Sequence, residues 1–220
     1  MNHEKIAVYL MPGMAANPSI FDGIQLDPSI FDVYRLEWFV PLKGMSMQTY
    51  AQQMCSFVKH PEPVLIGVSF GGLLVQEMAR LIPTKQVIIV SSIKSPKELP
   101  KRMLFAKYTK VHKLLPTGLI NNVELLAKYA FGETVTKRLA LYEKYLSIRD
   151  KYYIDWCIEQ LVNWKQQNIP KNLVHIQGER DAVFPLVNIQ NCTVVKGGTH
   201  TMIIHRARWF NENLPTIILQ

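Results

Sequence analysis

The octapeptide LIGVSFGG, residues 65–72, joins a run of aliphatic residues to a serine that has glycines close by on both sides. The spacing Gly67-x-Ser69-x-Gly71 is typical of a sharp turn between a buried strand and a helix. In such a turn the serine backbone is strained, and the two flanking positions lie too close to the strand and the helix for side chains. This turn would lift the Ser69 hydroxyl clear of a sheet and place the Phe70 amide at a helix N-terminus, where developing negative charge is stabilised. An ordinary glycine turn would explain the same residues, so the rest of the chain must supply the partners that a nucleophile needs.

Short aliphatic runs, bounded by turn residues, recur along the chain. Several are apolar throughout, as expected of strands that are covered on both faces. Between them, 46–60 and 71–82 carry apolar residues at helical spacing, and Pro83 stops the second of these helices. Strands that alternate with helices predict an α/β fold with a parallel, doubly wound sheet. The six predicted strands are 5–11, 32–38, 63–68, 86–91, 172–177 and 192–195.

Residues 95–167 break this alternation. They contain no strand-like run, and their apolar residues recur every three or four positions, which predicts three or four helices. The chain therefore reads as one core domain, 1–94 and 168–220, with a helical cap, 95–167, inserted between the fourth and fifth strands. Four apolar helix faces are expected, within 103–115, 119–130, 139–146 and 153–164.

The net charge of +8 is concentrated in one part of the chain. Residues 94–171 hold 15 of the 25 Lys and Arg residues but only 7 of the 17 Asp and Glu residues, so this segment accounts for the whole excess. A basic surface attracts nucleic acid, anionic lipid or an acidic substrate or carrier, although it is also common on an ordinary solvated helix face. No nucleic-acid motif accompanies it, so we expect no nucleic-acid partner.

The sequence also suggests a location. Its apolar runs are far shorter than the roughly 20 residues that span a bilayer, and 6–11 reads as a core strand rather than a signal peptide. The three cysteines, Cys55, Cys157 and Cys192, are far apart and lack metal-ligand spacing. This usage fits a reducing compartment, and we expect a cytoplasmic protein without a disulfide framework or zinc site.

A serine hydroxyl needs a base, and His200 is the best placed of the six histidines. It lies in Gly-Gly-Thr-His, directly after the last predicted strand, from which an imidazole can reach back over the carboxyl edge of the sheet. Asp181 ends the fifth strand at the same edge and would fix the imidazole tautomer. The other histidines occupy the N-terminus, the segment before Pro61, the insertion, the interior of a strand and the terminal helix, which is expected to run to Phe210.

A second donor for an oxyanion should come from the loop after the first strand. Gly13 permits close backbone approach there, and the Met14 amide is the donor we expect to act beside that of Phe70. A plain strand-ending turn would have the same composition. The sequence shows no carboxylate pair for glycoside chemistry, no H-E-x-x-H and no phosphate-binding loop, so no cofactor or metal is expected.

Taken together, the segments YLMPGMAANPSIFDGI, LIGVSFGGLLVQEMA, HIQGERDAVFP and VVKGGTHTMI resemble the α/β-hydrolase superfamily over nearly the whole chain. The resemblance implies catalytic roles for Ser69, Asp181 and His200 and oxyanion roles for Met14 and Phe70. Three departures stand out. Pro12 replaces the usual histidine before Gly13. The first predicted strand resembles what is normally the third, which implies a reduced sheet of six strands without the usual N-terminal pair. The insertion occupies the position where the family carries its lid.

The function expected from these features is hydrolysis of a carboxylic ester or thioester through an acyl-enzyme at Ser69. Amide cleavage is less favoured, because no extra acid is visible to protonate a poor leaving group. A basic cap could attract a substrate with an acidic leaving part, such as an acyl-coenzyme A or an acyl carrier protein. Two alternatives stay open: a lyase or acyltransferase that uses the same residues, and a non-catalytic ligand-binding or scaffold protein on this fold.

Overall fold

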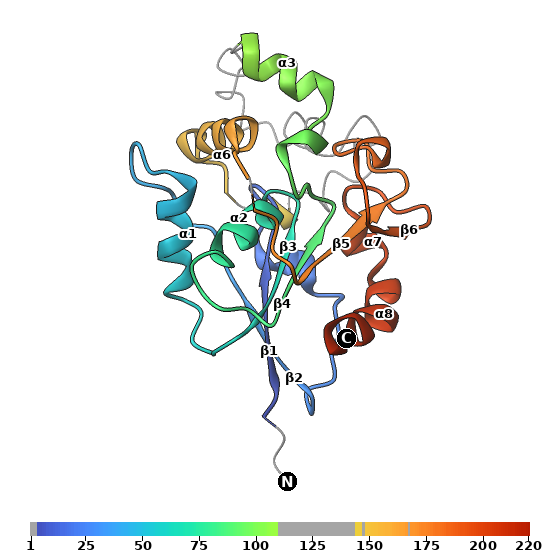
Figure 1. Ribbon diagram of the computed structural model, residues 1–220. Coiled ribbons are helices and arrows are strands. Elements are labelled where there is room, and N and C mark those ends of the chain that lie inside the picture. The colour runs from blue at the N-terminus through green and yellow to red at the C-terminus, as the bar shows by residue number, and fades with distance from the viewer. Residues whose placement is uncertain (1–3, 110–143, 147, 167) are drawn as a thin grey trace.

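A six-stranded parallel sheet forms the centre of the protein, with strand order β2-β1-β3-β4-β5-β6 (Figure 1). The computed structural model describes residues 4–109, 144–146, 148–166 and 168–220. All six predicted strands are present, within a few residues of their expected bounds. They are β1 (Ile6–Met11), β2 (Phe31–Arg35), β3 (Val64–Val68), β4 (Gln86–Val90), β5 (Leu173–Gly178) and β6 (Thr193–Val195).

The central strands are apolar because both faces of the sheet are covered. Every residue of β3 and nearly every residue of β1 and β4 is buried. At the edges the pattern is mixed, since β2 and β6 have exposed residues. Because all the strands run parallel, the carboxyl ends of β1, β3, β5 and β6 lie at the same end of the sheet. The loops that carry the candidate residues begin there.

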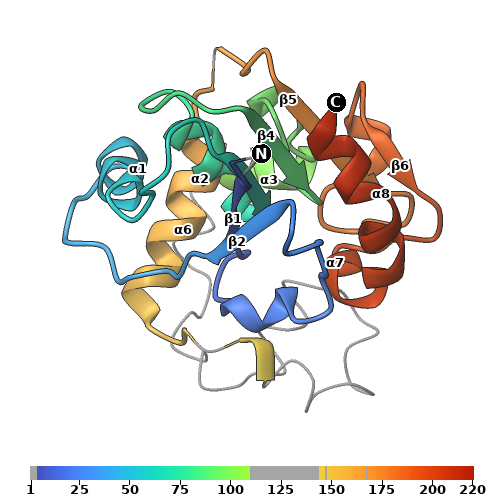
Figure 2. The same cartoon turned by 90° about the horizontal axis from the view of Figure 1, so that it is seen from below.

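Helices cover both faces of the sheet. On one face lie α1 (Met47–Cys55), α2 (Phe70–Met78) and α6 (Lys151–Asn163), and on the other lie α7 (Met202–His205) and α8 (Ala207–Leu219) (Figures 1 and 2). The α1 helix begins where the Ser46 hydroxyl accepts a hydrogen bond from the Thr49 N–H at 3.1 Å. Every residue of α2 is buried, because it lies against β3 and β4 and is covered by α1 and α6.

The C-terminal region differs from the single terminal helix expected to run to Phe210. The backbone leaves the helical conformation at Arg206, with φ −118° and ψ 26°, so α7 ends at His205 and α8 runs from Ala207 to Leu219. The break keeps α7 beside the loop after β6, where the Met202 N–H donates to the Thr199 carbonyl at 3.0 Å, while α8 buries Phe210, Leu214 and Ile218. Helical periodicity alone does not register a change of axis of this kind.

The segment between β4 and β5 carries α3 (Lys101–Thr109) and α6. The apolar face expected within 119–130, and most of that within 139–146, lie outside the described residues. The fourth expected face is buried: Tyr153, Cys157, Leu161 and Trp164 all belong to the central apolar cluster. Helix α6 is therefore packed into the core, while α3 lies beyond the carboxyl ends of the strands (Figure 1).

Within the described residues, no helix combines the length and the apolar character that crossing a bilayer requires.

Candidate active site

Ser69 lies at the turn between β3 and α2, with φ 53° and ψ −121°. This conformation is strained for a residue with a side chain, and the surrounding hydrogen bonds hold it. The Ser69 N–H donates to the Val90 carbonyl at 2.9 Å, and the Ser92 hydroxyl donates to the Ser69 carbonyl at 2.7 Å. Val90 is the last residue of β4, and Ser92 lies two residues after it. The neighbouring strand therefore fixes the turn that carries the Ser69 hydroxyl.

Two glycines make this turn possible through close backbone approach. A Cβ on Gly67 would overlap the Gly71 carbonyl, and a Cβ on Gly71 would overlap the carbonyls of Pro12 and Met11. The second contact brings the end of β1 against the start of α2. The glycine spacing seen in the sequence is thus required by packing at the Ser69 turn.

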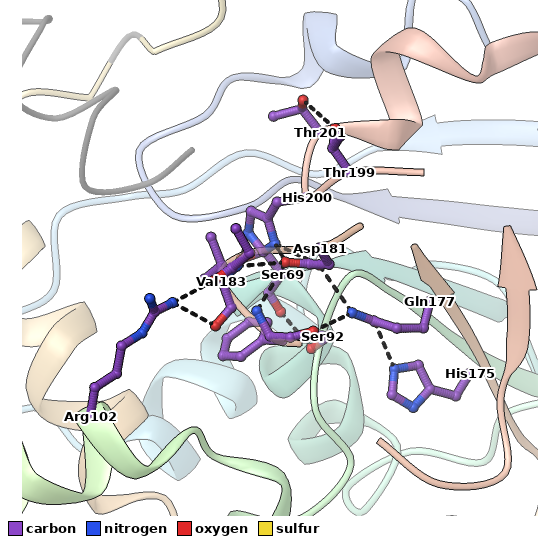
Figure 3. A network of polar contacts seen from close by, with 12 residues as sticks. Ser69, Ser92, Arg102, His175, Gln177, Asp181, Val183, Thr199, His200 and Thr201 are labelled. Atoms are coloured by element: carbon purple, nitrogen blue, oxygen red, sulfur yellow. Dashed lines mark hydrogen bonds and ion pairs between the residues drawn. The ribbon is translucent and has the colours of Figure 1, made fainter. Parts of the chain in front are cut away.

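His200 reaches Ser69 from the loop after β6. Its Nε2 lies 2.9 Å from the Ser69 Oγ, and its Nδ1 lies 2.9 Å from Oδ2 of Asp181 (Figure 3). A carboxylate only accepts hydrogen bonds, so Nδ1 carries the proton and the lone pair of Nε2 accepts the Ser69 hydroxyl. The imidazole is only 8% exposed, and the Phe184 ring packs edge-on against it. Three residues that are far apart in the sequence therefore form one hydrogen-bonded chain.

Asp181 is buried and surrounded by donors. Its Oδ1 accepts from the backbone N–H groups of Val183 and Phe184 at 2.8 and 2.9 Å, and its Oδ2 accepts from the Gln177 amide at 3.0 Å. Burial raises the pKa of this carboxyl. The charge that His200 carries when it is protonated, its hydrogen bond and the two backbone donors outweigh that effect and leave the pKa below its usual value. Asp181 is therefore held as a carboxylate.

The loops of Asp181 and His200 are tied to each other. The Arg180 N–H donates to the Gly198 carbonyl at 2.7 Å, and the Glu179 N–H donates to the Val195 carbonyl at 3.1 Å. A Cβ on Gly178 would lie 2.5 Å from the Gly198 oxygen, so the two loops also approach at a glycine. These contacts set the distance between the carboxylate and the imidazole.

The two expected amide donors belong to segments that lie next to Ser69. Phe70 is the first residue of α2, where the helix itself provides no acceptor for the N–H. Met14 follows Gly13, whose Cα lies so close to Ser69 that an added Cβ would be 3.3 Å from the Ser69 Cβ. The loop after β1 thus carries Met14, and the start of α2 carries Phe70.

Comparison with solved structures identifies the fold. A hydrolase from Pseudomonas aeruginosa PA01 matches with a TM-score of 0.73 at 11% identity, covering 97% of this chain and 90% of that one. A thermophilic esterase from Thermogutta terrifontis matches with 0.67 at 15%, covering 98% and 92%. An enol-lactonase from Burkholderia xenovorans LB400 matches with 0.68 at 15%, covering 99% and 93%. The chain has the α/β-hydrolase fold. No family model and no curated protein matches its sequence.

Three residues around the hydrolase-fold site were not singled out from the sequence. Gln177 on β5 donates to Asp181 and to the Phe184 carbonyl, and its oxygen lies 3.3 Å from Nε2 of the buried His175 (Figure 3). Its sequence signal is a pair of polar residues in an otherwise apolar strand. Ser92 supports the Ser69 turn. Arg102 on α3 donates to the backbone of the Asp181 loop, through the carbonyls of Ala182 and Val183.

The aromatic residues of the insertion have different surroundings in this hydrolase fold. Tyr153, Trp156 and Trp164 are buried in the core, whereas Phe105 is exposed. The side chains of Tyr108, Tyr129, Phe131 and Tyr142 lie outside the described part of the structure.

Proposed function

We propose that this protein is a serine hydrolase that cleaves a carboxylic ester or thioester through an acyl-enzyme at Ser69. The observation that carries the proposal is the hydrogen-bonded chain from Ser69 through His200 to the buried carboxylate of Asp181. Its order along the chain, serine then aspartate then histidine, is that of α/β-hydrolases. The similarity to an esterase and a lactonase supports the class of reaction, since both enzymes are named for cleavage of an ester-type bond.

The geometry supports a stepwise mechanism. The Ser69 Oγ adds to the substrate carbonyl carbon while its proton passes to His200 Nε2, and Asp181 stabilises the imidazolium that forms. The carbonyl oxygen becomes an oxyanion that accepts hydrogen bonds from the Phe70 and Met14 amides. Collapse of this intermediate expels the alcohol or thiol, which takes the proton from His200. Water then attacks the acyl-enzyme, giving its proton to His200, and the acid leaves as Ser69 recovers its hydrogen.

The basic segment 94–171 supports an acidic leaving part in the substrate, such as that of a coenzyme A or carrier-protein thioester. In that case salt lowers kcat/KM for acidic thioesters and leaves kcat/KM for neutral esters unchanged. An equal effect of salt on both substrates would contradict this part of the proposal.

The free thiols of Cys55, Cys157 and Cys192 support a reducing, cytoplasmic location, which fractionation of cells would test.

The first experiment is labelling with a fluorophosphonate probe, followed by peptide mass spectrometry and a panel of esters and thioesters. We expect an adduct at Ser69 alone, absent in Ser69→Ala. The control is Ser56→Ala, since the Ser56 hydroxyl caps only the Gln53 carbonyl and should not affect labelling. Asp181→Asn should lower kcat by about 10³- to 10⁴-fold, because the amide no longer holds the His200 imidazole in the tautomer that is protonated at Nδ1.

Folded wild-type protein that takes no label and cleaves no substrate would overturn the proposal. A non-catalytic binding protein on this fold would then be favoured. Labelling of Ser69 together with transfer of the acyl group to an acceptor other than water would favour the acyltransferase alternative.

A further inference from the structure

Trp38, which follows β2, contacts both segments that would supply the oxyanion donors. Its indole N–H donates to the Gly13 carbonyl at 2.8 Å, and its side chain is almost fully buried. Its ring also stacks on Phe70, with the ring centroids 5.3 Å apart and the planes 25° from parallel. One side chain thus joins the loop before Met14 to the first residue of α2.

The hydrogen bond to Gly13 fixes the direction of the Met14 N–H. These two groups belong to the same peptide unit, and no described peptide bond is cis. In a trans peptide the C=O and N–H point in opposite directions, so an oxygen held by Trp38 turns the Met14 N–H away from the indole. A flip of this peptide would reverse the N–H and remove it as a donor to the substrate.

The loop needs such a restraint because its conformation is strained. Ala15 has φ 62°, a left-handed conformation that costs an alanine of the order of 1–2 kcal/mol. The Ala16 N–H donates to the Gly13 carbonyl at 3.1 Å, and the Ala15 N–H donates to the hydroxyl of Tyr153 on α6 at 3.3 Å. The Trp38 and Tyr153 rings are themselves in contact, with centroids 5.8 Å apart. Two buried aromatic residues therefore hold this turn.

We infer that Trp38 is a positioning residue for the oxyanion site: its N–H sets the orientation of the Gly13–Met14 peptide, and its ring supports Phe70. This inference rests on the proposed function. It gives a role to a residue that the sequence presents only as an aromatic at the end of a predicted strand. A buried indole N–H also needs an acceptor for stability alone, so the test must separate an effect on the transition state from an effect on folding.

The variant Trp38→Phe removes the N–H and keeps an aromatic ring. The matched control is Trp156→Phe, since Trp156 is equally buried, touches Phe70 and donates its N–H to the backbone carbonyl of Met45 at 2.6 Å. Its acceptor lies outside the 13–16 turn. Both variants lose one buried indole hydrogen bond, but only Trp38→Phe removes a hydrogen bond from the Gly13–Met14 peptide.

The readouts are kcat, KM and the inhibition constant of a trifluoromethyl ketone. This inhibitor adds to the Ser69 Oγ, the serine proton passes to His200, and the ketone oxygen becomes the oxyanion. Removal of one oxyanion donor costs about 10²- to 10³-fold in kcat, so a misaligned donor should cost about 10- to 100-fold. For Trp38→Phe we expect that loss in kcat, a similar loss in affinity for the ketone and a KM within about twofold of wild type. Trp156→Phe should keep kcat and ketone affinity.

Equal losses in the two variants, or an unchanged kcat in Trp38→Phe, would overturn the inference. Should Trp38→Phe not fold, Tyr153→Phe tests the same turn, because it removes the acceptor of the Ala15 N–H; an unchanged kcat in that variant also overturns it. Wild-type protein that lacks both labelling and hydrolysis contradicts the proposed function itself. A labelled wild type with a normal Trp38→Phe contradicts only the role of Trp38.

Discussion

The buried His175 should make the protein sensitive to acid, and the size of the effect follows from its surroundings. Its side chain lies in the interior of β5 and is only 3% exposed. Burial lowers the pKa of His175 from 6.5 to about 4, and the nearby charge of Lys94 adds to this shift. Between these two values the unfolded chain binds a proton that the folded protein does not.

The sign of the effect follows from this difference in proton binding. Stability rises with pH wherever the unfolded state holds more protons, so it is lost as the pH falls below 6.5, and the loss levels off near pH 4. One pKa unit corresponds to about 1.4 kcal/mol, so lowering the pH from about 7.5 to about 4.5 should cost ~2–3 kcal/mol in the free energy of unfolding from this group alone.

The assay is urea unfolding, monitored by tryptophan fluorescence, at several pH values over this range. His175→Gln cannot take up the proton, and its stability should fall by ~2–3 kcal/mol less than that of the wild type over the range. Parallel curves for the wild type and His175→Gln would refute the reasoning, because the acid sensitivity would then come from other groups.

Three further substitutions test the contacts of the site. Ser69→Gly should be about 1 kcal/mol more stable than Ser69→Ala in urea unfolding. Glycine relieves a backbone strain of about 1–3 kcal/mol at φ 53°, and its greater entropy in the unfolded chain offsets about 0.4–1 kcal/mol of that gain. Equal stabilities of the two variants would contradict the strain. Gln177→Leu should lower kcat/KM by about 10-fold or more, since the Asp181 carboxylate loses a donor worth about 1.5–3 kcal/mol, and an unchanged kcat/KM would exclude that role. Trp164→Phe should reduce the free energy of unfolding by about 1–3 kcal/mol, because the buried Glu77 side chain loses the 2.8 Å hydrogen bond from the indole N–H. A stability equal to that of the wild type would show that Glu77 finds another donor.

The strand pattern was predictable because burial on both faces leaves an apolar signature. The runs that became β1, β3 and β4 were recognised from their composition, and the helix α1 from its apolar spacing after Ser46. The break at Arg206 was not predictable, because α7 and α8 both have helical periodicity and only the change of axis separates them.

The partners of Ser69 were predictable in part. His200 and Asp181 follow from the sequence because the loops after parallel strands meet at the same end of a sheet, and the structure brings both residues to Ser69. Gln177 was missed, since its role depends on the side of β5 to which its amide points. The function of Trp38 was likewise hidden, because its hydrogen bond joins residues 25 positions apart.

By itself, the sequence determined the order of strands and helices and the turn at Ser69, because glycine spacing, apolar runs and caps act over a few neighbouring residues. Only the tertiary structure decided which distant groups meet. It set the donors around Asp181, brought Tyr153 of α6 to the strained turn at Ala15, and aimed the Trp38 indole at Gly13. These contacts depend on the packing of helices against a twisted sheet, and local sequence patterns do not encode the resulting distances.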